Sequence, residues 1–354
     1  MSRTRAGALA GSLLFLSTLA ALAAAQKAPV FQGGVEMVNV TVTAHDGRGN
    51  LVSDLTAQDF TVKEDGRTQN LQLFAASARQ VHAGERSPVT GELRCTRCSA
   101  VLHVATGQTV PPCPEGHRTF DVDSQQELSL NLGMLFDTSE SMRKEIKLSQ
   151  ESAIRFLDAI PRAKDLLLIF FDRDIRISRY NSENQQGIFE RILGTEGSGY
   201  TALNDSIAVY LSRVVDTPGR KVLVLFSDGD DTTSRLNAGD VEQLLRGSDV
   251  VVYTVAFAGE RPHSEEGLRA QSFLAMLAEV TGGRVFKPRA SKELAAIYQS
   301  ILDELGSQYV IGYVSDNPAR DGRFRKLLVE VKRPGLKLRY RPGYSTPRDQ
   351  PAKR

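Results

Sequence analysis

An apolar run that ends abruptly in polar side chains is the feature that most limits how this chain can fold. Residues 132–142 read LGMLFDTSESM, so a short apolar run is followed at once by Asp137, Ser139 and Ser141. Continuous apolar runs of this length are typical of strands buried on both faces of a parallel sheet. In an open α/β sheet, the loop after such a strand lies at the carboxyl edge, where ligands bind. We therefore expect these three side chains at a binding edge.

Two later segments bring further oxygen-bearing side chains to the same edge. The run at 221–226 (KVLVLF) is followed by Asp228 and then a glycine, which suits a tight turn close to a ligand. The glycine-rich loop at 197–201 places Thr201 at the start of a helical pattern. Oxygen ligands without histidine or thiolate suit a hard divalent cation, Mg²⁺ first and Mn²⁺ or Ca²⁺ next. Because only two of the five side chains are charged, such an ion can still accept an anionic ligand.

Each of these residues also has an ordinary structural explanation. Ser139, Ser141 and Thr201 are good helix N-caps, and Asp228 followed by glycine is common turn chemistry. A single one of them is more often a cap than a ligand. The complete set, in order and at successive strand ends, favours a metal site.

Four more acids crowd the loops on or near this edge. We expect Asp172 and Asp174 to be solvated loop acids. Asp230 and Asp231 follow Asp228 directly, so they could tune the field around an ion or repel a badly placed partner.

The segment DTSES at 137–141 matches the D-x-S-x-S signature and resembles the von Willebrand factor A domains. Thr201 and Asp228 lie where that family has its threonine and second aspartate, and the resemblance spans about 128–305. It implies a metal-ion-dependent adhesion site (MIDAS), in which a protein partner's Asp or Glu carboxylate completes the coordination of Mg²⁺. The implied metal residues are Asp137, Ser139, Ser141, Thr201 and Asp228.

The same region alternates between apolar runs and helical patterns, which predicts a doubly wound, mostly parallel sheet covered on both faces. The remaining expected strands are 165–171, an edge strand at 175–180, 250–257 and 284–286. The expected helices are 141–160, 185–193, 202–215, 238–246, 268–281 and 292–305.

Strand patterns also occupy both ends of the chain. Residues 35–74 hold too few strands to close a sandwich alone. The runs at 309–314, 325–332 and 336–340 supply more, and we expect them to form a meander. The simplest arrangement is one small β-sandwich built from both ends, with the α/β domain inserted. The patterns V-x-V-x-V-x3-D-x2-G and DF-x-V-x-EDG, with the terminal RPGY, resemble the bacterial secreted "VWFA-related domain" proteins.

A cysteine-containing segment separates the first strands from the α/β region. Cys95, Cys98, Cys113 and His117 have the spacing C-x2-C-x14-C-x3-H, which is typical of zinc ribbons. The sequence therefore predicts a structural Zn²⁺ with a closed Cys3His shell and no catalytic role. Oxidation of Cys95 and Cys98 to a disulfide is the competing interpretation, and it leaves Cys113 free. His103 is a rival fourth ligand with a less suitable spacing.

The amino terminus has the layout of a secretory signal peptide. Arg3 and Arg5 precede an apolar segment at about 8–22, and small residues then offer a cleavage site before Gln26. A retained membrane anchor is the alternative, although the apolar segment is short for a span. We expect an exported protein, periplasmic or extracellular, with no membrane span after cleavage. The predicted divisions are a signal peptide at 1–25, sandwich strands at 34–80, a zinc-ribbon-like insertion at 90–122, the A domain at 127–305, further sandwich strands at 307–346 and a tail at 347–354.

Charge and motifs exclude several functions. The 354-residue chain carries a net charge of +2, so nothing global indicates nucleic acid as a partner. No nucleotide-binding loop, nucleophile elbow or zinc-protease helix is present. The sequence predicts a non-enzymatic adhesion or scaffold module that captures a partner carboxylate through the metal. The alternatives are a metal-assisted hydrolase that uses the same site and a structural envelope protein with a vestigial site.

Overall fold

The computed structural model describes residues 37–348 except for 77–79, 88–90, 96, 106, 123–128, 144–145, 160–164, 181–184, 195–198 and 259–262. The predicted signal peptide and most of the predicted tail lie outside the described residues. No helix in the described part of the chain is both long enough and apolar enough to cross a membrane.

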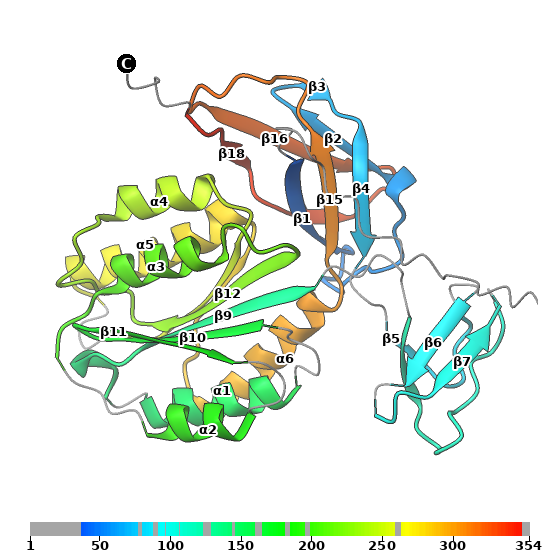
Figure 1. The fold of residues 1–354 in the computed structure, drawn as a ribbon, viewed down its shortest axis with the longest axis horizontal. Coiled ribbons are helices and arrows are strands. Elements are labelled where there is room, and N and C mark those ends of the chain that lie inside the picture. Colours follow the sequence, from blue (N-terminus) through cyan, green and yellow to red (C-terminus); the bar gives the residue numbers. More distant parts are fainter. Residues whose placement is uncertain are drawn as a thin grey trace, which may run out of the picture. The chain divides into compact units, whose positions relative to one another are not determined.

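A six-stranded sheet forms the centre of the α/β region (Figure 1). All neighbouring strands are parallel except β11, which is antiparallel at one edge, so the prediction of a mostly parallel sheet is confirmed. In spatial order the strands are β11 (Ile175–Tyr180), β10 (Asp165–Phe171), β9 (Leu130–Asp137), β12 (Arg220–Ser227), β13 (Val251–Ala256) and β14 (Arg284–Phe286).

Helices cover both faces of this sheet, which explains why its central strands read as continuous apolar runs. The helices α1 (Ile146–Ala159), α2 (Gln185–Leu193) and α6 (Leu294–Leu305) cover one face. The helices α3 (Leu203–Val214), α4 (Ala238–Arg246) and α5 (Glu265–Thr281) cover the other (Figure 1). Alternate residues of β9 enter the two cores, and Phe136 stacks on Phe226 of β12 with ring centroids 4.7 Å apart. This packing fixes the two central strand ends side by side.

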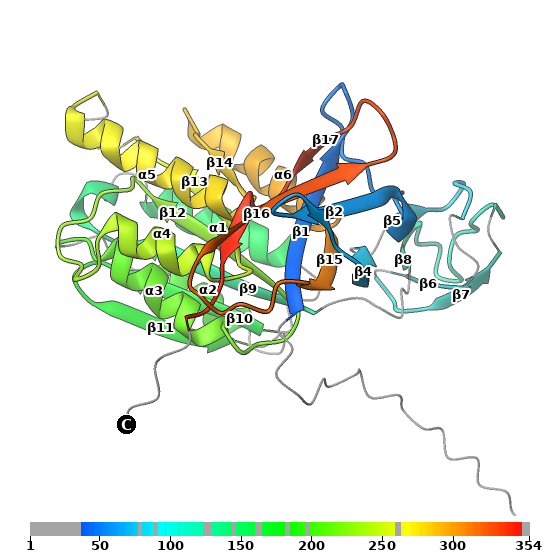
Figure 2. The ribbon, with the colours of Figure 1, turned by 90° about the horizontal axis from the view of Figure 1, so that it is seen from above.

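Strands from both ends of the chain form two four-stranded sheets that share one apolar core. One sheet has the order β17 (Lys337–Arg339), β1 (Met37–His45), β15 (Tyr309–Val314) and β4 (Leu71–Ala76). The other has the order β18 (Gly343–Ser345), β16 (Phe324–Val331), β2 (Phe60–Glu64) and β3 (Arg67–Thr68). In Figures 1 and 2 the blue β1 and the orange β15 lie side by side, as their antiparallel pairing requires. The predicted sandwich built from both ends of the chain is confirmed.

The predicted C-terminal meander is wrong. β15 pairs with β1 and β4, whereas β16 pairs with β2 and β18 in the other sheet. Consecutive strands therefore alternate between the sheets and pair with strands more than 200 residues earlier. The reason is that each sheet buries one apolar face only by pairing N-terminal with C-terminal strands, and no local sequence pattern reports that choice.

A separate small sheet lies between these two regions in the sequence. Its strands, in the order β5 (Gln80–His82), β8 (Thr119–Val122), β6 (Gly91–Cys95) and β7 (Val101–Val104), are antiparallel. Among the residues that the structure describes here, its buried cluster contains eight, including Cys95 and Cys113. A core of this size stabilises little structure alone, which agrees with the predicted metal-supported insertion.

Candidate functional site at the carboxyl edge of the sheet

Asp137 is the last residue of β9, so the strand delivers its carboxylate to the carboxyl edge of the sheet. Its Oδ1 accepts a hydrogen bond from the backbone N–H of Ser139 at 3.0 Å. Its Oδ2 accepts one from the hydroxyl of Ser227, at the end of the neighbouring β12, at 2.6 Å. The carboxylate is thereby fixed between two adjacent strand ends.

The two serines of the first loop connect Asp137 to Asp228. A short 3₁₀ turn at Glu140–Met142 follows Ser139, and the hydroxyl oxygens of Ser139 and Ser141 lie 3.0 Å apart. Ser141 also makes a side-chain hydrogen bond with Asp228, whose Oδ1 accepts the N–H of Asp230 at 3.2 Å. Four of the five predicted metal residues therefore form one continuous polar cluster.

Thr201, the fifth residue, is buried in the loop that lies between the other two. Its carbonyl oxygen accepts the backbone N–H groups of Thr232 and Thr233 at 2.9 and 3.0 Å. Two residues earlier, the carbonyl oxygen of Gly199 accepts the N–H of Glu140 at 3.3 Å. Backbone hydrogen bonds thus join all three loops that carry the predicted residues.

The electrostatics of the cluster suit a cation. Burial and the nearby Asp228 carboxylate raise the pKa of Asp137 to about 7. Burial also raises the pKa of Asp228, although hydrogen bonds from Ser141 and Asp230 oppose this. Two buried carboxylates that repel each other are stabilised by a positive charge between them. The donor set of carboxylates and hydroxyls is also the set that hard divalent cations prefer.

The roles of two residues at this edge were not predicted from the sequence. Ser227 is fully buried and holds Asp137, yet its position in a strand-ending SDG triplet indicated only a turn. Asp172 is 7% exposed, so the expectation of a solvated acid is wrong for it. Arg176 on β11 pairs with Asp172 at 2.8 Å and keeps the pKa of Asp172 below its usual value despite its burial. Arg176 lies only four residues after Asp172, but the sequence does not show that the antiparallel pairing of β10 and β11 brings the two side chains together.

The other three acids near this edge differ in their surroundings. Asp174 and Asp230 are exposed, and the charge of Asp230 contributes to the raised pKa of Asp228. Asp231 accepts the backbone N–H of Asn204 in the first turn of α3 at 2.7 Å. Asp231 therefore acts as a helix cap.

A comparison with protein families identifies the domain. Residues 131–300 match the family model of the von Willebrand factor type A domain. Together with the doubly wound sheet, this match decides the assignment. These residues are a von Willebrand factor type A domain. Such a domain implies a protein-binding or scaffold role and suggests that a divalent metal is bound.

Several solved structures are similar to this chain. A von Willebrand factor type A protein from Catenulispora acidiphila is 14% identical, with a TM-score of 0.43 over 82% of this chain and 74% of that chain. An aerotolerance-related membrane protein from Bacteroides fragilis is 13% identical, with a TM-score of 0.42 over 50% of this chain and 98% of that chain. The pilus adhesin SpaC from Lactobacillus rhamnosus GG is 9% identical, with a TM-score of 0.43 over 63% of this chain and 44% of that chain. No curated protein matches the chain.

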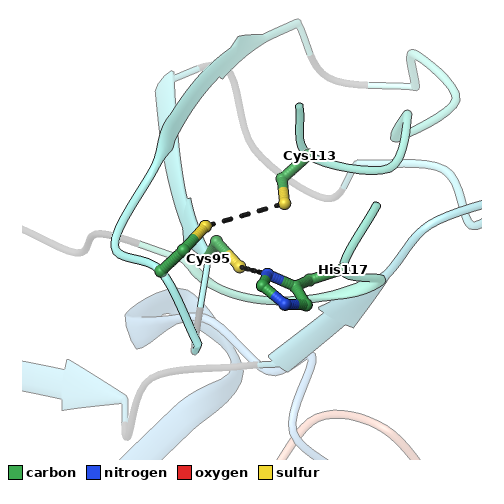
Figure 3. A group of neighbouring side chains, drawn as sticks. Cys95, Cys113 and His117 are labelled. Carbon is green, nitrogen blue, oxygen red and sulfur yellow. Dashed lines mark hydrogen bonds between the residues drawn. The ribbon is translucent and has the colours of Figure 1, made fainter. Parts of the chain in front are cut away.

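A second polar cluster lies in the small antiparallel sheet, outside the von Willebrand factor type A domain. The potential ligand atoms of Cys95, Cys98, Cys113 and His117 all lie within 4.8 Å of one another. The Cys95 sulfur lies 3.6 Å from Nδ1 of His117 (Figure 3). The sulfurs of Cys98 and Cys113 are 3.7 Å apart. All three cysteines are free thiols, so the structure contains no disulfide between Cys95 and Cys98.

Backbone geometry around Cys95 favours its thiolate. Burial alone raises the pKa of Cys95, but hydrogen bonds from the backbone N–H groups of Cys98 and Arg97 and from the other thiols lower it to about 6. On the opposite turn, Cys113 and His117 are joined by a backbone hydrogen bond of 2.9 Å. Two turns thus present four ligand atoms to one point, whereas His103, the rival ligand, is exposed and lies near Glu92.

Proposed function

We propose that this protein is an exported, metal-dependent protein-binding module of the adhesion or scaffold type. In this proposal Asp137, Ser139, Ser141, Thr201 and Asp228 hold one Mg²⁺, or Mn²⁺ or Ca²⁺, as a MIDAS. The observation that carries the proposal is the buried pair of mutually repelling carboxylates, linked through the two serine hydroxyls at the edge of the sheet.

The charge of the site indicates what the ion would bind. Two carboxylates at most balance a divalent cation, and three neutral hydroxyls add no charge. An ion held this way keeps its attraction for a further anionic oxygen. We infer that the ligand is a protein partner that presents an Asp or Glu carboxylate, and that the module performs recognition and no catalysis.

Partner capture tests this function. Immobilised protein is exposed to an extract of the source cells, and retained proteins are eluted with EDTA. We expect a partner to be released by EDTA, to be recaptured with Mg²⁺ or Mn²⁺, and to be absent with Asp137→Ala. Asp174→Asn is the matched control, because Asp174 is an exposed acid at the same edge outside the polar cluster. A partner that remains bound after EDTA and to Asp137→Ala would contradict adhesion through the metal.

For the second cluster we propose a structural Zn²⁺ held by Cys95, Cys98, Cys113 and His117. A tetrahedral site with Zn–S bonds of about 2.3 Å has sulfur–sulfur edges of about 3.8 Å. The distance of 3.7 Å between the sulfurs of Cys98 and Cys113 agrees with such an edge. Elemental analysis of the purified protein tests this proposal: one zinc per chain supports it, and none in protein purified without chelators contradicts it.

The proposal that the protein is exported is based on the sequence of the amino terminus. We propose that the signal peptide at 1–25 is removed and that the mature protein acts in the periplasm or outside the cell. The intact mass of protein purified from the source cells tests this step. A mature chain that begins near Gln26 supports export, and a chain that retains residues 1–25 contradicts it.

A further inference from the structure

An ion pair between the half-exposed Arg176 and the buried Asp172 lies at the carboxyl edge beside the proposed metal residues. Arg176 on β11 approaches Asp172 at the end of β10 with both arms of its guanidinium group. Nη1 donates to Oδ1 at 3.1 Å and Nη2 donates to Oδ2 at 2.8 Å. Two parallel hydrogen bonds of this kind fix the relative orientation of both groups, which a lysine cannot do.

Arg176 also reaches the loop that contains the D-x-S-x-S signature. Its Nη2 donates to the hydroxyl of Thr138 at 3.0 Å, and that hydroxyl donates to the carbonyl oxygen of Phe171 at 3.0 Å. The backbone N–H of Thr138 bonds to the same carbonyl at 2.7 Å. Thr138 lies between Asp137 and Ser139 in the sequence, so its anchoring fixes the segment that carries three of the proposed ligands.

Asp172 is also hydrogen-bonded to the loop that contains Thr201. Its carbonyl oxygen accepts the backbone N–H of Ala202 at 2.8 Å, while its carboxylate accepts the N–H of Asp174 at 2.8 Å. Ala202 directly follows Thr201. The two paired residues therefore contact neighbours of proposed ligands in two separate loops, Arg176 through its side chain at Thr138 and Asp172 through its backbone carbonyl at Ala202.

We propose that Arg176 is a positioning residue that keeps Ser139 and Thr201 in register for one metal ion, an inference that rests on the proposed MIDAS. Without the guanidinium group, Asp172 becomes a buried carboxylate without its bidentate partner, and both loops lose a common anchor. Groups that orient metal ligands typically change metal affinity by about 10- to 100-fold.

The test is a Mn²⁺ titration of the full mature chain by calorimetry. We expect Arg176→Met to weaken Mn²⁺ binding about 10- to 100-fold and Arg176→Lys, which keeps the charge but loses the two-point contact, to be intermediate. Arg173→Met is the matched control because Arg173 is exposed in the same hairpin, and it should bind Mn²⁺ as the wild type does. Unchanged affinity in both Arg176 variants would overturn the proposal.

Hydrogen exchange in EDTA gives a readout that needs no metal. In Arg176→Met, we expect faster exchange at the amides of Thr138 and Ala202 and unchanged exchange in the central strands β9 and β12. Uniformly faster exchange across the sheet would assign Arg176 a general structural role and overturn the proposal. If the wild type binds no Mn²⁺, the proposed function fails, whereas the exchange result still decides whether this ion pair fixes the two loops.

Discussion

At the scale of single residues, the protonation of Asp137 is the property that most affects the proposed metal site. Burial and the charge of Asp228 raise the pKa of Asp137 to about 7. A proton and a metal ion compete for such a carboxylate, since ligands must be deprotonated to bind. Asp137 is thus expected to be fully deprotonated, and able to bind a metal ion without losing a proton, only above about pH 8.

This competition predicts how Mg²⁺ affinity depends on pH. Below pH 7 an arriving ion has to displace the proton of Asp137, so affinity should fall about tenfold per pH unit, and it should level off above pH 8. Titration calorimetry between pH 5.5 and 8.5 measures the slope. An affinity that is flat through this range would mean that Asp137 is ionised throughout, contrary to its buried position beside a second acid.

Gly229, in the turn after Asp228, is a second residue on which the site depends. Its φ of +88° lies in the left-handed region, and a Cβ there would lie 2.6 Å from the carbonyl oxygen of Ala270 in α5. The turn can therefore approach α5 only without a side chain. The sequence suggested the tight turn, but it could not reveal the close contact with α5.

We predict that Gly229→Ala destabilises the protein and weakens Mg²⁺ binding by displacing Asp228. Gly66→Ala is the matched control, because Gly66 has a similar φ of +84° but open space around its Cβ position. The control should cost about 1 kcal/mol from backbone strain, and Gly229→Ala should cost clearly more. Urea unfolding measures both. Equal destabilisation of the two variants would argue against the contact with α5.

At the scale of elements, the sequence predicted the strands of the α/β region better than the strands of the sandwich. β9 and β12 are buried on both faces, so each reads as an unbroken apolar run, and α2 and α4 were predicted with their observed bounds. The first helix was predicted too early, because a 3₁₀ turn at Glu140–Met142 precedes α1. Ser139 and Ser141 belong to that turn region, where their hydroxyls face each other.

The small sheet of β5 to β8 is the element whose stability should depend most on a metal. In the described part of this segment its core has eight buried residues, and they include two of the four proposed zinc ligands. A zinc-selective chelator should therefore unfold this sheet, and hydrogen exchange should accelerate in residues 80–122 while β9 and β12 stay protected. Cys98→Ser should have the same local effect without a chelator. Protection that persists in 80–122 after zinc removal would contradict a structural metal.

At the scale of the whole molecule, the chain leaves the sandwich after β4 and returns to it at β15. The alternation of β15, β16 and β17 between two sheets could not be predicted, because strand pairing over more than 200 residues leaves no local pattern. The buried Glu304 at the end of α6 connects the two regions. It pairs with Arg284 of β14 at 3.0 Å and also contacts Arg339 of β17.

We predict that Arg339→Met lowers the free energy of unfolding by about 2 kcal/mol or more. The variant leaves the buried Glu304 with a single arginine, and a buried charge that loses a partner is strongly destabilising. Arg333→Met is the control, since the ion pair of Arg333 with Asp54 is exposed and should contribute little. Denaturant unfolding of both variants provides the comparison. Similar effects of the two substitutions would contradict a connecting role for Glu304.

We propose above all that three loops of the von Willebrand factor type A domain together hold one hard cation. The most direct measurement is a titration of metal-free mature protein with Mn²⁺, followed by electron paramagnetic resonance, which counts free and bound ions. One Mn²⁺ per wild-type chain, displaced by excess Mg²⁺ and absent in Asp137→Ala, is the predicted result. No binding at millimolar Mn²⁺, or equal binding by Asp137→Ala, would contradict the claim.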